Sequence, residues 1–167
     1  MRRTFFKDII NSSKQTGKEG FYMAIAMVIR YVDVICDDSL KSIYINGKKA
    51  GYQFNVRLAC YRGHFLSVIN EISLKTDGEE VPENDIFFCI HGKEFGLSQM
   101  KENNSEFWRI VESATIKVLK RGGLEEGEHT LDFHMVYRCP YMPIGELEYM
   151  PWDSSQEKKL TLKEYLH

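Results

Sequence analysis

The residues best able to do chemistry in this chain are a few histidines and cysteines and one turn rich in arginine, and their spacing matches no common catalytic motif. The sequence holds no GxSxG nucleophile elbow, no GxxxxGK[ST] phosphate loop and no GxGxxG dinucleotide motif. Cys139 precedes Pro140 and has no expected helix N-terminus to activate its thiol. We therefore assign no catalytic residue to the chain.

The histidines do not follow a metal-ligand pattern. A cupin-type site needs two histidines one residue apart on a strand, whereas His129 and His134 are five apart and point to opposite faces. His64 and His91 fall in loops or at strand ends. We expect no metal and no cofactor in this chain.

Asp132, His134 and Arg138 share one face of a predicted strand. Asp–His pairs can serve acid–base chemistry, but polar residues on such a face are more often its solvated side. We favour the solvated face.

The most unusual stretch is Asn55 to Ile69, NVRLACYRGHFLSVI. Arg57 is expected on the outward face of a strand, and Tyr61, Arg62 and His64 then fall in one turn. An arginine fork and aromatic rings in a turn suit recognition of a carboxylate or of a sugar face. An ion pair between an arginine of this stretch and a nearby glutamate, such as Glu71, is the alternative.

The elements that must position these residues are strands. Short alternating segments are separated by Asn46-Gly47, Asp77-Gly78 and glycine-rich turns, which favour hairpins. The pattern predicts a mainly β, antiparallel β-sandwich or jelly-roll-like single domain. Residues 97–111 form a short helical or irregular insertion. Residues 85–90, apolar on both faces, are expected to be covered on both sides, and 128–139 form the longest strand.

The two ends differ from the predicted domain, 23–139. Residues 140–167 hold three of the four prolines and many apolar residues, which predicts an extended arm and a final strand packed on the domain or on a partner. We interpret residues 1–22 as a translated leader. The codons for Lys18-Glu19-Gly20 can contain the purine run with which bacteria position ribosomes, and translation of the natural protein would then start at Met23 or Met27. An ordinary N-terminal helix is the alternative.

Composition narrows the class of protein. The chain has 22 basic and 24 acidic residues, so it lacks the basic excess of a nucleic-acid binder. The apolar run 21–29 is shorter than the roughly 18 residues of a membrane span. Four cysteines without a CxxC pair suggest reduced thiols in a cytoplasmic protein.

Several segments resemble the small (beta) subunit of bacterial C-glycoside deglycosidases over about 37–143. The resemblance rests on YQFNVRLACYRGHFLSVINEISLKTDGEEVPENDIFFCIHGKEF, KVLKRGGLEEGEH and YRCPYMP, in that order. Residues 1–22 lie outside it.

The resemblance implies a non-catalytic β-sandwich subunit of a hetero-oligomer. Its expected partner is a large (alpha) subunit like the sugar-isomerase TIM barrels, which holds a divalent metal, often Mn²⁺, and the acid–base residues. Together they would cleave 3-oxo-C-glycosides, such as those of flavonoids, by elimination. On this resemblance Arg57, Tyr61, Arg62, His64, Tyr141 and Met142 are expected at the subunit interface or at the rim of the site.

Two other classes of function stay open. A free-standing carbohydrate-binding β-sandwich would be a stable monomer that binds sugars by itself. An enzyme with its own metal would purify with manganese or zinc when it is expressed alone.

Overall fold

The computed structural model describes residues 26–28 and 32–164, so the leader hypothesis for 1–22 lies outside the described residues. Twelve strands and three short 3₁₀ helices make up the described chain, and none of its helices is long and apolar enough to span a membrane. The strands are β1 (Lys41–Ile45), β2 (Lys48–Arg57), β3 (His64–Phe65), β4 (Ile69–Thr76), β5 (Glu79–Glu80), β6 (Ile86–Ile90), β7 (Lys93–Gly96), β8 (Phe107–Trp108), β9 (Ser113–Leu119), β10 (Gly127–Gly145), β11 (Glu148–Asp153) and β12 (Gln156–Leu162). The 3₁₀ helices are η2 (Leu66–Val68), η3 (Glu83–Asp85) and η4 (Leu97–Glu102).

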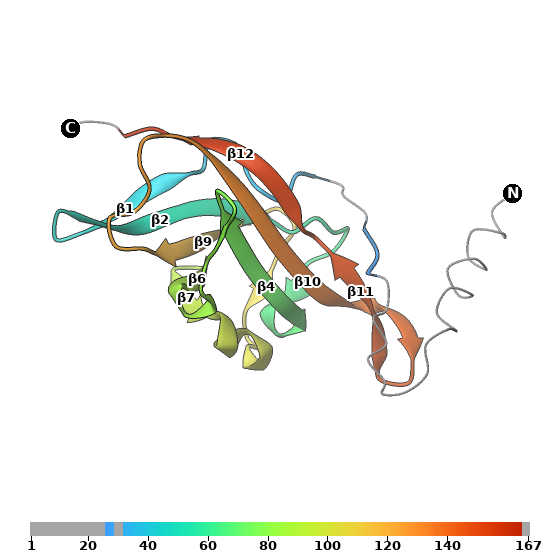
Figure 1. The fold of residues 1–167 in the computed structure, drawn as a ribbon. Helices are drawn as coiled ribbons and strands as arrows, with labels where there is room; N and C mark the ends of the chain where they lie inside the picture. The colour runs from blue at the N-terminus through green and yellow to red at the C-terminus, as the bar shows by residue number, and fades with distance from the viewer. Residues whose placement is uncertain (1–25, 29–31, 165–167) are drawn as a thin grey trace, which may run out of the picture.

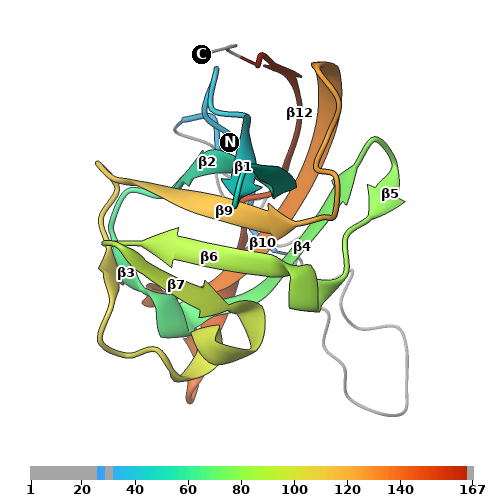
Figure 2. The same cartoon turned by 90° about the vertical axis from the view of Figure 1, so that its left-hand side faces the viewer.

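Two antiparallel sheets face each other, as the sequence predicted (Figures 1 and 2). The first sheet has the order β1-β2-β9-β6-β7. The second has the order β11-β10-β4-β5, and β12 also pairs with β10. A separate ribbon joins β3 to β8 through the pairs His64–Trp108 and Phe65–Phe107. The fold is a single β-sandwich domain.

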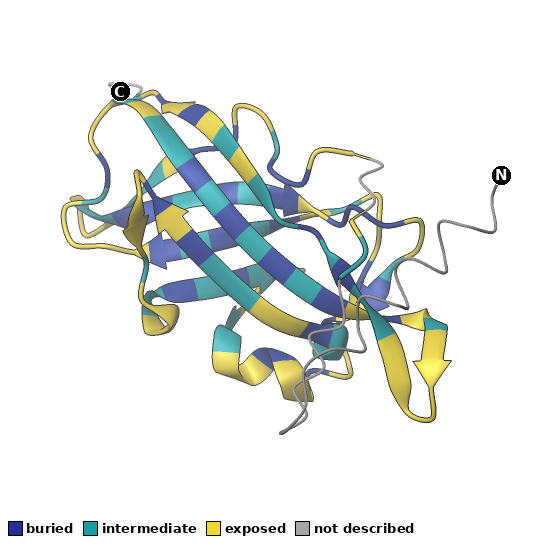
Figure 3. Ribbon diagram, turned by 45° about the vertical axis from the view of Figure 1, so that its right-hand side comes forward, coloured by how far each residue is buried: buried dark blue, intermediate teal, exposed yellow. Residues whose placement is uncertain are grey.

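The core fills the space between the two sheets. Phe54 of β2 meets Phe133 of β10 edge to face, with ring centroids 6.0 Å apart. The Tyr52 hydroxyl lies 2.7 Å from the Thr76 hydroxyl, so a buried hydrogen bond also joins the sheets. Alternate residues of β10 are buried and half-buried, which is the pattern of a strand with one face on the core (Figure 3).

The hairpin turns predicted at Asn46-Gly47 and Asp77-Gly78 are confirmed, and His91-Gly92 forms a third turn of the same kind. Asn46-Gly47, Asp77-Gly78 and His91-Gly92 each have both residues at positive φ. In each turn the flanking residues pair directly, for example Ile45 with Lys48. These are the two-residue turns that match the twist of the strands they join.

The prediction that residues 85–90 are covered on both faces is wrong. Strand β6 lies inside the first sheet, between β9 and β7, and buries Ile86, Phe88 and Ile90. Phe87 and Cys89 point to the other side and are only half-buried. An apolar run alone does not reveal how much of its second face is covered.

The predicted insertion is real but is only partly helical. Within 97–111 the chain forms η4, then an irregular loop that contains the two-residue strand β8. Trp108 is buried against Phe88 of β6, with ring centroids 5.2 Å apart. The insertion is therefore anchored in the core of the sandwich.

Strand β10 is longer than the predicted 128–139 and continues through Pro140 and Pro143 to Gly145. Beyond Tyr137 its pairing is with β11, through Arg138–Pro151, Pro143–Tyr149 and Gly145–Glu148. The prolines thus lie in a two-stranded ribbon that projects from the sandwich (Figures 1 and 3). Strand β12 returns along β10 from Phe133 to Gly127.

Candidate functional site

The 61–64 turn and Tyr141 come together at one end of the sandwich. Strand β2 ends at Arg57, and the buried residues Leu58, Ala59 and Cys60 carry the chain to the turn. Tyr141, on the extended part of β10, donates a hydrogen bond from its hydroxyl to the Gly63 carbonyl at 3.4 Å. Two segments almost eighty residues apart in sequence therefore form one surface.

Arg62 lies over the exposed rings of Tyr61 and Tyr141. Its guanidinium carbon is 5.8 Å from the Tyr61 ring centroid and 5.0 Å from that of Tyr141. The two rings lie 6.4 Å apart, and both tyrosines are about two-fifths exposed. Stacking on two rings holds the guanidinium in place while its hydrogen-bond donors remain available to a ligand.

His64 is buried beneath this surface, with 3% of its area exposed. Its ring packs against Tyr137 and Tyr141, at centroid distances of 4.9 and 5.7 Å. Burial lowers its pKa to about 4, so the ring is neutral near pH 7. His64 supports the turn from below and does not face solvent at its rim.

The Nε2 atom of His64 lies 3.3 Å from the Cys60 Sγ atom, a distance that suits a nucleophile and its base. Both side chains are buried, however. All four cysteines are free. Because a buried thiol is not open to a substrate, we interpret the Cys60–His64 pair as structural.

The other two predicted residues lie outside this ring cluster. Arg57 ends β2, and its side chain reaches toward Cys36, while its backbone N–H donates to the Val34 carbonyl at 2.7 Å. Met142 follows Tyr141 but packs against the core, because neighbouring strand residues point to opposite faces. Glu71, the glutamate suggested as an alternative partner for an arginine of this stretch, instead has a carboxylate oxygen 3.7 Å from the Nε2 atom of His134.

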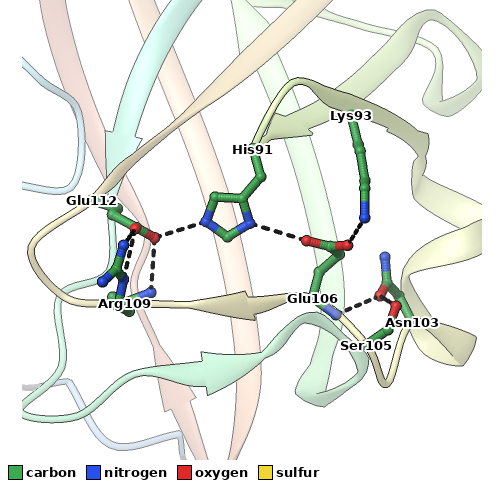
Figure 4. Close-up of polar contacts among 7 residues, drawn as sticks. All are labelled: His91, Lys93, Asn103, Ser105, Glu106, Arg109 and Glu112. Carbon is green, nitrogen blue, oxygen red and sulfur yellow. Dashed lines mark hydrogen bonds and ion pairs between the residues drawn. The ribbon is translucent and has the colours of Figure 1, made fainter.

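A loop beside the turn is held by a network of charged groups (Figure 4). The ring nitrogens of His91 lie 3.0 Å from a carboxylate oxygen of Glu106 and 3.0 Å from one of Glu112. Lys93 pairs with Glu106, and Arg109 pairs with Glu112. Hydrogen bonds to Glu106 and Glu112 raise the pKa of His91, so the ring is more readily charged than a free imidazole.

This network fixes both ends of the segment that carries Phe107. The Glu106 carbonyl also accepts a hydrogen bond from the Leu66 N–H at 3.0 Å, and the Trp108 indole donates to the Glu112 carbonyl at 3.1 Å. The exposed ring of Phe107 packs edge to face on Phe65, with centroids 5.0 Å apart. The loop is thus a fixed wall next to the 61–64 turn.

The outer face of the second sheet has the character of a solvated face. His134 contacts Ser155 and Glu71, and Arg138 donates to the Ser67 carbonyl at 2.8 Å. Within residues 26–28 and 32–164, no group of three histidine, cysteine or acidic side chains is arranged to hold a metal ion. This face offers ordinary surface contacts rather than an acid–base pair.

Sequence reasoning did not find Phe65, Phe107 or the His91 network. The pairs His64-Phe65 and Phe107-Trp108 alternate one exposed or half-exposed ring with one buried ring, which is the signal of a short strand. Two residues are too few for that signal to stand out in a sequence. The contacts that His91 and Lys93 make with Glu106 and Glu112 join residues 13 to 21 positions apart through a loop, so no spacing rule predicts them.

Comparison with known proteins identifies the family. The model of the C-glycoside deglycosidase beta subunit family matches residues 31–141. The C-glycoside deglycosidase beta subunit of Eubacterium cellulosolvens is 36% identical over 98 residues, which are 59% of this chain and 67% of that protein. The 3'-dehydrocarminate deglycosidase beta subunit of a Microbacterium species is 25% identical over 131 residues, 78% of this chain and 94% of that protein. With more than half of its length matched, this chain belongs to the C-glycoside deglycosidase beta subunit family.

Proposed function

We propose that this chain is the non-catalytic small subunit of a cytoplasmic lyase complex that cleaves the carbon–carbon bond of 3-oxo-C-glycosides. Its membership of a family of beta subunits carries the proposal, since a beta subunit works with another chain. A relative is named for 3'-dehydrocarminate, and that name supports an oxidised sugar as the substrate class. The proposed partner is a large subunit of the sugar-isomerase TIM-barrel type.

The proposed reaction is an elimination. A carbonyl group at C3 of the sugar makes the proton at C2 acidic, and a base of the large subunit removes that proton. The electron pair left at C2 forms a double bond to C1 as the bond from C1 to the aglycone breaks. The electron pair of the broken bond leaves with the aglycone carbon, which takes a proton from a general acid. A divalent metal held by the large subunit, expected to be Mn²⁺, would supply positive charge near the C2–C3 enediolate.

This chain contributes binding rather than chemistry in the proposal. Its sandwich presents a fixed surface to the large subunit and stabilises the assembled complex. Arg62 of the 61–64 turn, stacked on the exposed rings of Tyr61 and Tyr141, supports this role, because Tyr and Arg are enriched at the centres of interfaces.

Co-expression tests the proposal directly. We would purify this chain through a tag, together with the sugar-isomerase-like protein encoded beside it, and assay a 3-oxo-C-glycoside with manganese. We expect the two chains to co-elute and the aglycone to be released only when both are present. If the chain is monodisperse, does not bind the large protein and binds sugars by itself, the result would favour the free-standing carbohydrate-binding module. Bound manganese or zinc in the chain expressed alone would favour an independent enzyme.

Arg62→Ala is expected to weaken association with the large subunit about tenfold, because the substitution removes the guanidinium and the surface stacked on two tyrosines. Arg121→Ala, in an exposed turn, is the control and should change association less than twofold. A pull-down titration with each variant measures the difference. Equal effects of the two substitutions would remove Arg62 from the interface.

A further inference from the structure

The exposed rings around the 61–64 turn form one continuous surface, which we call the aromatic end surface: Tyr61, Arg62, Phe65, Phe107 and Tyr141. Each aromatic member is between 38% and 45% exposed. We propose that the large subunit docks on the aromatic end surface and places a carboxylate against Arg62. This inference rests on the proposed function.

Gly63 makes the surface continuous. Its carbonyl accepts the hydrogen bond from Tyr141, and its α-carbon packs so closely on β8 that a Cβ atom would lie 2.6 Å from the Phe107 ring. Phe107 in turn packs on Phe65. The tyrosine and arginine half of the surface therefore joins the phenylalanine half without a gap.

The charges of the surface indicate the chemistry of the partner. Arg62 is its one charged member, and within the described residues no carboxylate forms an ion pair with Arg62. The nearby carboxylates of Glu106 and Glu112 are already paired with His91, Lys93 and Arg109. A partner that buries these rings must supply a negative group for Arg62, since a desolvated and unpaired guanidinium would be costly.

Two further observations favour the large subunit as the occupant. All five residues lie within 31–141, the part of the chain shared with the beta subunit family. The exposed apolar residues of the β10–β11 ribbon tip, Ile144, Leu147 and Tyr149, lie outside it. A partner common to the family is expected to use the shared part of the chain.

The surface is also built to bind without rearrangement. The ion pairs of Figure 4 fix the loop that holds Phe107, and buried His64 supports the turn from below. Groups that are already held in place lose little conformational entropy when a partner covers them. Rigid aromatic rings on such a frame are typical of binding hot spots.

The test measures the affinity of the full-length chain for the co-purified large subunit. Phe65→Asp and Arg62→Glu are each expected to weaken binding about 30-fold or more, because one places a charge among the rings and the other repels the proposed carboxylate. Tyr44→Asp is the matched control, since Tyr44 is an exposed aromatic residue on β1 (53% exposed). It should bind within about threefold of the wild type. Circular dichroism and thermal melting would show that each variant is folded.

The outcomes separate the two proposals. If the wild type binds the large subunit and both variants bind as tightly as Tyr44→Asp, the surface inference is overturned while the proposed function stands. If the wild type does not bind the large subunit, the proposed function fails and the surface inference fails with it. If light scattering shows that the chain dimerises and that Phe65→Asp abolishes the dimer, the surface belongs to a second copy of this chain. If deletion of 1–22 leaves binding unchanged while both variants lose it, the large subunit is supported over the N-terminal segment as the occupant.

Discussion

Gly63→Ala is expected to weaken binding to the large subunit at least tenfold and to lower the free energy of unfolding by about 1–3 kcal/mol. An added Cβ atom would lie 2.6 Å from the Trp108 carbonyl oxygen and 2.6 Å from the Phe107 ring. A backbone oxygen cannot rotate away, so the 61–64 turn must move off β8. That movement would separate Tyr61 and Arg62 from Phe107 and break the continuity of the aromatic end surface.

Gly96→Ala is the matched control for this substitution. Gly96 has a φ of −67°, and a Cβ atom there would meet only the Gln99 side chain, at 3.8 Å. We expect a change below about 0.5 kcal/mol and unaltered binding. Urea unfolding and a binding titration measure both quantities. A Gly63→Ala protein as stable as Gly96→Ala and as tightly bound would show that the turn tolerates the methyl group.

The fold was predictable from the sequence because its turns and its alternation are local signals. Asn46-Gly47 and Asp77-Gly78 fix two hairpins, and the alternation of buried and polar residues along β10 fixes which face meets the core. The coverage of β6 was not predictable. Whether Phe87 and Cys89 are buried depends on what packs on the outer face of the sheet, which is a tertiary property.

The candidate site was predictable in part. The sequence predicted that Tyr61 and Arg62 lie in a turn suited to recognition. The structure adds Tyr141, which the long strand β10 carries to the same place. His64, in the same turn, proved to be buried, because β3 pairs it with Trp108 and turns its ring toward Tyr137. The burial of one residue among exposed neighbours depends on that pairing, and a sequence does not show it.

The pairing of His64 also sets a dependence of stability on pH. The pKa of His64 is lowered by burial to about 4, whereas an unfolded histidine titrates near 6.5. Below pH 6.5 His64 binds a proton in the unfolded chain but not in the folded chain. The residue therefore makes the folded protein less stable as the pH falls toward 4. The full effect is about 3 kcal/mol. The groups that face the ring are the Cys60 thiol and the rings of Tyr137 and Tyr141, and there is no carboxylate among them to offset the loss.

Urea unfolding of the wild type and of His64→Gln at pH 7 and pH 4.5 would isolate this contribution. As the pH falls from 7 to 4.5, the free energy of unfolding of His64→Gln is expected to rise relative to that of the wild type by most of that 3 kcal/mol, whatever the variant's stability at pH 7.

His91→Gln is expected to change in the opposite direction, so that its free energy of unfolding falls relative to that of the wild type as the pH falls from 7 to 4.5. Hydrogen bonds to Glu106 and Glu112 raise the pKa of His91, so its contribution is full below pH 6.5 and is lost as the pH rises through the raised pKa. Parallel pH profiles for the wild type and His64→Gln would mean that the ring accepts its proton in the folded protein, and the turn above it would then have to open to water. Opposite changes in the relative stability of His64→Gln and His91→Gln would show that two different rings support the aromatic end surface. The His64 ring beneath the 61–64 turn would be neutral and buried, and the His91 ring beside the Phe107 loop would be charged and exposed.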